Sequence, residues 1–238
     1  MFIHGFQTPW QIWQPHIDFF KEEYYVLIPI LSGHDIEQST TFDSIGQEAD
    51  FIEKFIIDNY GGTLFAVCGI SMGGTIAAEL WAKQTLKIEY MYLDGAMLIS
   101  PPGSMSSAVY MQYLEMKQSI LERDPNVLLD FENSFMPKKY MEHFLVLIDA
   151  MTKKTIKNCV YSISDFVLPN NTFESETEIL FSHGTTLSEQ FSRKSAQMLK
   201  QRYPMTRIQE LSGYNHCEQV LFRPEEHIIV IDQFLKNK

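Results

Sequence analysis

One stretch of the chain decides the fold: Leu64-Phe65-Ala66-Val67-Cys68-Gly69-Ile70-Ser71-Met72-Gly73-Gly74. Its first five residues are all apolar, as expected of a central strand that is buried on both faces of a parallel sheet. The residues after it have the spacing of a helix that begins near position 73. A serine flanked by glycines lies between the two elements. This strand–turn–helix pattern predicts an α/β fold with a functional serine at the turn.

The glycines around Ser71 have a physical reason. A serine on a sharp strand-to-helix turn takes a strained backbone, so the residues two positions away must be small. Gly69 and Gly73 meet this need, and Gly74 lets the helix lie close to the sheet. The N-terminus of that helix favours negative charge developing near the serine. A phosphate loop (GxxxxGK[ST]) and a dinucleotide fingerprint (GxGxxG) are both excluded by the spacing.

Short apolar runs alternate with helical patterns on both sides of this turn, which is typical of a mostly parallel sheet covered by helices. About six strands are expected. They are Phe2–His4, Tyr25–Ile30, Leu64–Cys68, Ala96–Ile99, Glu178–Phe181 and Arg207–Leu211. Helices are expected near 9–20, 44–59, 73–85, 188–202 and 225–236.

A long segment after the fourth expected strand has helical patterns but no strand. It is too long for an ordinary connection between elements. It is also rich in methionine and aromatic residues. We interpret it as a helical cap over the strand ends, although the same residues would also serve as the core of the segment itself. The expected division is 1–103 for the first part of the core, 104–175 for the cap and 176–238 for the second part of the core.

Composition narrows the possible functions of the 238-residue chain. It carries 19 Lys and Arg against 30 Asp and Glu, a net charge of −11, which argues against nucleic-acid binding. No apolar run is long enough to cross a membrane, and the N-terminus does not resemble a secretory signal. Its three cysteines, Cys68, Cys159 and Cys217, indicate neither a disulfide framework nor a zinc site. We therefore expect a cytoplasmic protein that acts on a small molecule, as a monomer or homodimer.

Two further motifs would complete a site around Ser71. His4-Gly5-Phe6 follows the first expected strand, and Gly5 lets the next backbone N–H turn inward. The N–H groups of Phe6 and Met72 would then stabilise an oxyanion. His216 is the expected general base, because it lies in a glycine-containing loop after the last strand. His34 is the second candidate for the general base, the reserve if His216 does not serve, and we expect His4 to have a structural role.

The chain resembles the α/β-hydrolase superfamily in the His4-Gly5 turn, the Gly69–Gly73 nucleophile elbow and the late His216. The resemblance extends from residue 2 to about 236. It implies a Ser-His-acid triad, no metal, no organic cofactor, and a helical cap at the place where we expect one. The family usually begins with two further strands, and this chain matches from the third, so one edge of the sheet is expected to be shorter.

The acid of the triad departs from the family pattern. The family commonly places it three residues after a glycine in the turn, and from Gly184 that position is Leu187, which cannot orient an imidazole. Glu189, two residues later and with a longer side chain, is the first candidate. Asp165 is the reserve, and a Ser-His pair without an acid is the third possibility.

Three functions follow from this site. The leading one is a carboxylesterase-like serine hydrolase that cleaves an ester or other acyl bond of a small, apolar substrate through an acyl-enzyme. The second is a lyase similar to the capped synthase of menaquinone biosynthesis, with the triad abstracting a proton from an anionic substrate. The third is a ligand-binding or signalling protein of this fold with weak or no turnover.

Overall fold

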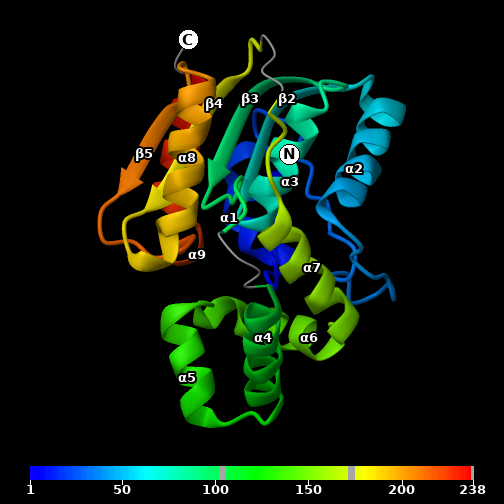
Figure 1. Cartoon of the computed structure of the whole chain (residues 1–238), viewed down its shortest axis with the longest axis vertical. Coiled ribbons are helices and arrows are strands. Elements are labelled where there is room, and N and C mark those ends of the chain that lie inside the picture. Colours follow the sequence, from blue (N-terminus) through cyan, green and yellow to red (C-terminus); the bar gives the residue numbers. More distant parts are fainter. Residues whose placement is uncertain (102–105, 171–174, 237–238) are drawn as a thin grey trace.

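The centre of the molecule is a parallel sheet of five strands, seen in a computed structural model that describes residues 1–101, 106–170 and 175–236. Each strand pairs with the next one in the sequence, in the order β1-β2-β3-β4-β5. All pairs are parallel, so the carboxyl ends meet at one edge, the lower one in Figure 1. The strands are β1 Phe2–Ile3, β2 Thr63–Ile70, β3 Lys87–Asp94, β4 Glu178–Gly184 and β5 Arg207–Leu211.

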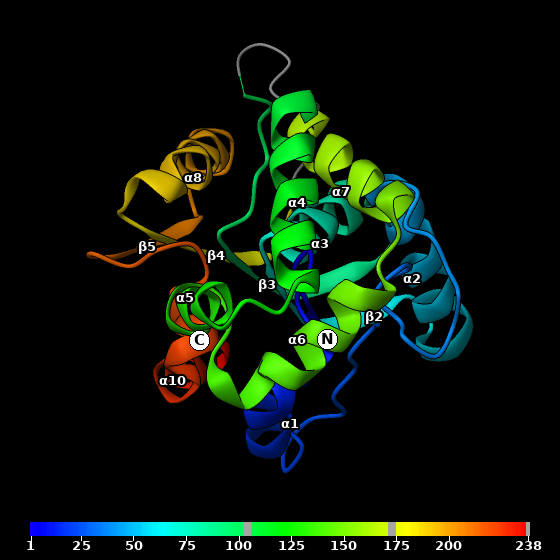
Figure 2. The same cartoon turned by 90° about the horizontal axis from the view of Figure 1, so that it is seen from below.

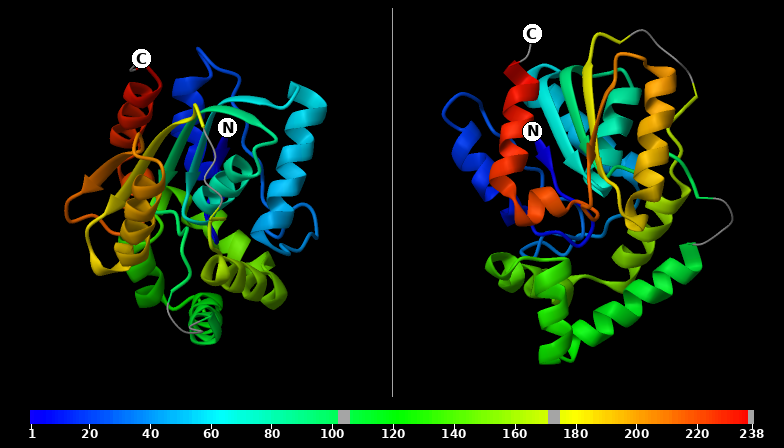
Figure 3. Two further views of the ribbon diagram at one scale, coloured as in Figure 1. Left: turned by 45° about the horizontal axis from the view of Figure 1, so that its top comes forward. Right: turned by 90° about the vertical axis from the view of Figure 1, so that its left-hand side faces the viewer.

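Helices cover both faces of this sheet. One face packs against α2 (Ile45–Tyr60), α3 (Met72–Ala82) and α8 (Gln190–Arg202). The other packs against η1 (Trp10–Trp13), α1 (Gln14–Phe20), α9 (Glu218–Phe222) and α10 (Pro224–Lys236). The right-hand view of Figure 3 shows the sheet between these two layers. The five expected helices are confirmed, with ends that differ by a few residues.

Local sequence explains where these elements begin and end. Helix α2 starts after Ser44, whose Oγ accepts a hydrogen bond from the Gln47 N–H at 3.1 Å, and ends at Gly61 in the left-handed conformation. Alternate β3 residues face opposite layers: Leu93 packs with the α2–α3–α8 side and Tyr92 with the α1–α10 side. Both faces of the sheet therefore carry an apolar core.

Four helices lie between β3 and β4: α4 (Ser106–Leu121), α5 (Pro125–Ser134), α6 (Met141–Ala150) and α7 (Lys153–Asp165), with the short η2 (Lys138–Tyr140) before α6. Viewed from below in Figure 2, they lie in front of the carboxyl ends of the strands. This segment of helices was expected from the sequence. The boundary expected between residues 103 and 104 lies outside the described residues.

Two of the six expected strands are wrong. Tyr25–Ile30 has no regular secondary structure, and among the described residues its one backbone hydrogen bond to the sheet is from the Phe2 N–H to the Leu27 carbonyl at 2.8 Å. The strand expected at Ala96–Ile99 is instead β3, which ends at Asp94. Gly95 then turns the chain with a φ of 64°, and the apolar residues after it pack as a loop. The helical segment thus follows the third strand in sequence, not the fourth.

Within the described ranges, no helix combines the length and the apolar character that crossing a bilayer requires.

Candidate active site

Ser71 lies between β2 and α3 in a strained conformation. Its φ of 50° and ψ of −121° fall in a region that a residue with a side chain rarely adopts. The turn is held by its own N–H, which donates to the carbonyl of Asp94 at the end of β3, at 2.8 Å. A Cβ at Gly69 would collide with the backbone of Gly73, and a Cβ at Gly73 with the backbone of Ile3. Glycine at both positions is therefore required by packing, as the sequence indicates.

His216 and Glu189 lie in line with this serine. The Nε2 atom of His216 is 2.8 Å from Ser71 Oγ, and its Nδ1 atom forms a hydrogen bond with Glu189 Oε1. Glu189 ends the short turn η3 (Leu187–Glu189) and is fully buried, while Leu187 is 78% exposed. Its second carboxylate oxygen accepts the N–H of Gly184 at 3.2 Å. The structure thus brings together the serine, the histidine and the first candidate for the acid.

The ionisation states of Glu189 and His216 depend on each other. Burial would raise the pKa of Glu189, yet its hydrogen bond with His216 and the charge of that ring lower it below the usual range. Burial would likewise lower the pKa of His216, but its neighbours Cys217 and Glu189 outweigh burial and raise it well above its ordinary value. Both shifts favour an ionised carboxylate beside the imidazole. Such a carboxylate fixes the ring orientation and leaves Nε2 to exchange a proton with Ser71.

Two backbone N–H groups are free near the serine, those of Phe6 and Met72. In the described part of the chain, neither donates to a protein acceptor. Gly5 brings the first of them close, because the Cα of Gly5 packs so near Ser71 that an added Cβ would lie 3.3 Å from the Ser71 Cβ. The N–H of the next residue, Gln7, is already bonded to His34 Nε2 at 3.2 Å.

Two other histidines support this turn. His4 Nε2 accepts the N–H of Leu31 at 3.2 Å, and His34 accepts from Gln7 as described. Burial lowers the pKa of His4 to about 4 and that of His34 to about 3, so both rings are neutral acceptors. Neither lies in the line of Ser71 and His216. His34, the reserve for the base, serves to hold the turn in this structure.

Asp165, the reserve for the acid, also lies elsewhere. It ends α7, and its carboxylate accepts a hydrogen bond from the Ser106 hydroxyl at 3.3 Å.

Two buried polar residues, Asp94 at the end of β3 and His227 on α10, were not predicted from the sequence as part of the site. The signal for Asp94 was a carboxylate directly after the apolar run 90–93. No local signal marked His227, which lies on the buried face of its helix.

The serine opens into a cavity of about 250 Å³ between the strand ends and the α4–α7 segment. Apart from the polar groups of Ser71 and His216, its walls are mainly apolar. They include Phe6, Met97, Val109, Phe135, Val160, Ile163, Phe191 and Leu221. Among the described residues, none of those lining the cavity is Lys, Arg, Asp or Glu. The cavity therefore suits an uncharged, apolar group beside a polar reaction centre.

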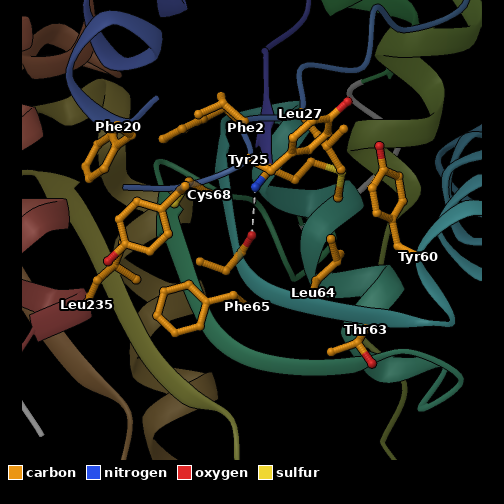
Figure 4. A pocket seen from close by; sticks show the side chains of 14 residues that line it. Phe2, Phe20, Tyr25, Leu27, Tyr60, Thr63, Leu64, Phe65, Cys68 and Leu235 are labelled. Atoms are coloured by element: carbon orange, nitrogen blue, oxygen red, sulfur yellow. Dashed lines mark hydrogen bonds between the residues drawn. The ribbon is translucent and has the colours of Figure 1, made fainter. Parts of the chain in front are cut away.

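A second cavity of similar size lies at the β1–β2 edge of the sheet, where Met1, Phe20, Tyr25, Phe65 and Leu235 are among the lining residues (Figure 4). Its one drawn polar contact is the hydrogen bond from the Met1 amino group to the carbonyl of Ala66, at 2.8 Å. Nothing in this wall resembles the arrangement at Ser71. Among the described residues, those lining the edge cavity include no histidine and no carboxylate.

Comparisons with known proteins place the chain among relatives of the same fold. Two pimeloyl-[acyl-carrier protein] methyl ester esterases of Legionella pneumophila are similar to it, and the first is 28% identical over 89 residues. The match spans 37% of this chain and about a third (34%) of the length of the relative.

Solved structures match over nearly the whole chain. An alpha/beta hydrolase family protein from Desulfitobacterium hafniense has a TM-score of 0.80 at 20% identity, with 99% of this chain and 94% of that chain covered. A carboxylesterase structure from Nitrososphaera gargenis has a TM-score of 0.75 at 15% identity, covering 98% and 88%. MenH from S. aureus has a TM-score of 0.68 at 18% identity, covering 99% and 92%. At these identities the likeness is one of fold.

A family model described as the alpha/beta hydrolase fold matches residues 1–212. The matched range includes the Ser71 elbow and Glu189, and ends four residues before His216. The chain belongs to the alpha/beta hydrolase fold family.

Proposed function

We propose that this protein is a serine esterase that hydrolyses an ester of a small, apolar acyl group. The observation that carries the proposal is the continuous line from the strained Ser71 through His216 to the buried Glu189. A structural serine would need neither the strain nor a half-buried imidazole at hydrogen-bond distance. In the same proposal, the α4–α7 segment is the cap and the remainder is the core.

The reaction follows from the geometry. Ser71 Oγ attacks the ester carbonyl carbon while His216 Nε2 takes the hydroxyl proton. The N–H groups of Phe6 and Met72 stabilise the oxyanion of the tetrahedral intermediate, a contribution of about 2.7–4 kcal/mol for each donor. The carbonyl re-forms, and the alcohol leaves with the proton from His216. Water then attacks the acyl-enzyme while His216 takes its proton. The bond between the acyl carbon and Ser71 Oγ breaks as His216 returns this proton to Ser71 Oγ, and the carboxylic acid is released.

The cavity walls support an uncharged substrate. A synthase of the kind that acts on a cyclohexadiene carboxylate needs a cation to hold its anionic substrate, and the described cavity lining contains no Lys or Arg. The name of the curated relative adds methyl esters of acyl chains to the substrates worth testing. Purified protein is therefore expected to leave the synthase intermediate unchanged.

The proposal is tested with a series of p-nitrophenyl and methyl esters of two to eight carbons. We expect hydrolysis of short and medium chains by the wild type and none by Ser71→Ala, with circular dichroism showing that the variant is folded. Turnover retained in Ser71→Ala would move the nucleophile elsewhere. Saturable ligand binding without any product, even at high protein concentration, would instead favour a binding protein of this fold.

A further inference from the structure

A second buried polar group lies directly behind the line of Ser71, His216 and Glu189. Asp94 ends β3, and its side chain is 1% exposed. Its backbone carbonyl accepts the N–H of Ser71 at 2.8 Å. Its carboxyl atom Oδ2 has no hydrogen-bond partner among the described residues. A buried carboxyl left without a donor costs stability, so its presence beside the reaction centre requires an explanation.

Asp94 is linked to His216 through the next residue. Gly95 packs against the imidazole so closely that a Cβ there would lie 2.8 Å from His216 Cε1 and 3.0 Å from Nδ1. On the same side, the Sγ atom of Cys217 lies 3.7 Å from the Asp94 carbonyl oxygen. The end of β3 therefore forms the surface on which the His216 ring rests. A shift of Asp94 would move both the serine turn and the base.

Two further histidines lie near the Asp94 carboxyl group. His227 Nε2 on α10 is 3.6 Å from Asp94 Oδ2, and its Nδ1 is 2.7 Å from Nε2 of His16 on α1. All three side chains are fully or almost fully buried. Several buried atoms of this cluster have no hydrogen-bond partner among the described residues. They are Trp13 Nε1, His16 Nδ1, Asp94 Oδ2 and His227 Nε2, with the Trp13 ring packed against both histidines.

We propose that Asp94 is a positioning residue of the proposed esterase: a second buried carboxyl group that supports the His216–Glu189 pair and faces His227, which is in turn hydrogen-bonded to His16. The inference rests on the function proposed for Ser71 and His216. Asp94 acts in two ways, by fixing the end of β3 under the serine and the base, and by placing a titratable charge behind the imidazole.

The histidine pair can accommodate both protonation states of Asp94. Burial lowers the pKa of His227 to about 3, so the ring is neutral and carries one proton. When His16 donates to His227 Nδ1, the His227 proton lies on Nε2 and faces an ionised Asp94. When His227 donates to His16 instead, Nε2 is bare and faces a protonated Asp94. Ionisation of Asp94 therefore needs only a change of tautomer behind it, with the proton released to solvent.

Burial raises the pKa of Asp94 to about 7, the nearby charge of Glu189 adds to the rise, and His216 opposes it. Asp94 therefore changes charge in the pH range in which an esterase of this kind would work. The titratable groups that face or surround it are Tyr92 on β3, Glu189 on η3, His216 and Cys217 after β5, His227 on α10 and, behind it, His16 on α1. The ionised form attracts the proton of His216 and so delays its loss as pH rises.

The test is the pH profile of kcat/KM for ester hydrolysis in Asp94→Asn. The acid limb of this profile reports the pKa of the base, His216, in the free enzyme. Because the variant lacks the negative charge, we expect this limb to shift down by about one pH unit. The maximal kcat should fall about tenfold with little change in KM, because the contact acts on the base and not on substrate. Glu48→Gln is the matched control, since Glu48 is also a buried carboxyl but accepts from Ser32 on α2's side of the sheet. An unshifted profile in a folded Asp94→Asn would overturn the proposal.

A variant that keeps Asp94 covers the case in which Asp94→Asn does not fold. His227→Leu removes the group behind the carboxyl and favours its protonated form, so the acid limb should shift in the same direction by a smaller amount. A profile identical to that of the wild type would count against the proposal.

A measurement without turnover separates this inference from the esterase proposal. In wild-type protein with ¹³C-labelled aspartate carboxyls, the Asp94 signal, assigned as the one missing from Asp94→Asn or displaced in His227→Leu, should titrate near pH 7. The imidazole signal of His216 should move with it. Titration of Asp94 below pH 5 would overturn the inference, whereas a wild type that hydrolyses no ester would refute the esterase proposal and leave this titration to decide the role of Asp94.

Discussion

Two cavities of nearly equal size, about 250 Å³ at Ser71 and about 220 Å³ at the β1–β2 edge, have opposite chemistry. Both are lined mainly by apolar side chains. At the edge, the walls are aromatic rings in ordinary contacts, such as Tyr24 stacked on Phe65 at 5.3 Å. At the strand ends, the walls include a strained serine and a half-buried imidazole, and this imidazole is hydrogen-bonded to a buried carboxylate outside the lining.

The difference shows that size and apolar lining do not mark a reaction site. The Ser71 cavity is distinguished by nearby features that lower the stability of the fold. They are the positive φ at Ser71, the fully buried Glu189 and the Asp94 oxygen that has no hydrogen-bond partner among the described residues. Among the described residues, the lining of the edge cavity contains none of these. Substitutions at the Ser71 cavity and at the edge cavity should therefore differ in their effect on turnover.

The largest expected effect comes from removing the base. His216→Ala should lower kcat for ester hydrolysis by about 10⁵–10⁶-fold, because the serine then has no proton acceptor. His143→Ala is the matched control, since His143 is exposed on α6. Steady-state kinetics on the best substrate of the ester series measures both. A His216→Ala variant within tenfold of the wild type would mean that the two cavities do not differ in the way described.

Removing the charge of the acid should have the next largest effect. Glu189→Gln is expected to lower kcat by about 10³–10⁴-fold, because a neutral amide no longer fixes the tautomer of His216 or stabilises the imidazolium. Asp165→Asn, at the reserve position on α7, should leave kcat unchanged. If Asp165→Asn were the damaging change and Glu189→Gln the harmless one, the assignment of the acid would be reversed.

The pH dependence of the free energy of unfolding tests how much the buried carboxyl group of Asp94 affects stability. The pKa of Asp94 in the folded protein is about 7, above its ordinary value of 3.8, so folding favours the protonated form. This contribution is fully present below about pH 4 and is lost as pH rises through about 7. The free energy of unfolding of the wild type, relative to Asp94→Asn, should therefore fall over this window by at most about 4 kcal/mol. Urea unfolding at pH 4, 6 and 8 measures it, and a constant difference would contradict the shift.

The smallest effect is expected at the edge cavity. Phe65→Ala enlarges that cavity, and the side chain is 38% exposed, so the loss of stability should be about 1–2 kcal/mol. Ester turnover below the unfolding temperature should stay within twofold of the wild type. A large drop in kcat with an unchanged thermal midpoint would show that the edge cavity takes part in the reaction.

The groups nearest the reaction were the most predictable from sequence. Ser71 is fixed by glycines at two neighbouring positions, since any larger residue there meets backbone. His216 is marked by its loop after the last strand. Glu189 was predicted as the acid because Leu187 cannot orient an imidazole and the longer glutamate side chain can extend to His216. The structure brings Ser71, His216 and Glu189 together.

Features that depend on distant parts of the chain escaped prediction. The run Tyr25–Ile30 has strand-like composition, but the adjoining edge strand β1 is only two residues long and offers one bond. The end of β3 was misplaced because apolar residues continue past Gly95, where the turn depends on a positive φ. The contact between His16 and His227 joins residues 211 positions apart and leaves no local pattern.

The central claim, that Ser71 is activated by His216, is tested most directly by intact-mass analysis after treatment with a fluorophosphonate. We expect one adduct on the wild type and none on Ser71→Ala or His216→Ala, with all three proteins folded by circular dichroism. No adduct on the folded wild type, or an equal adduct on Ser71→Ala, would contradict it.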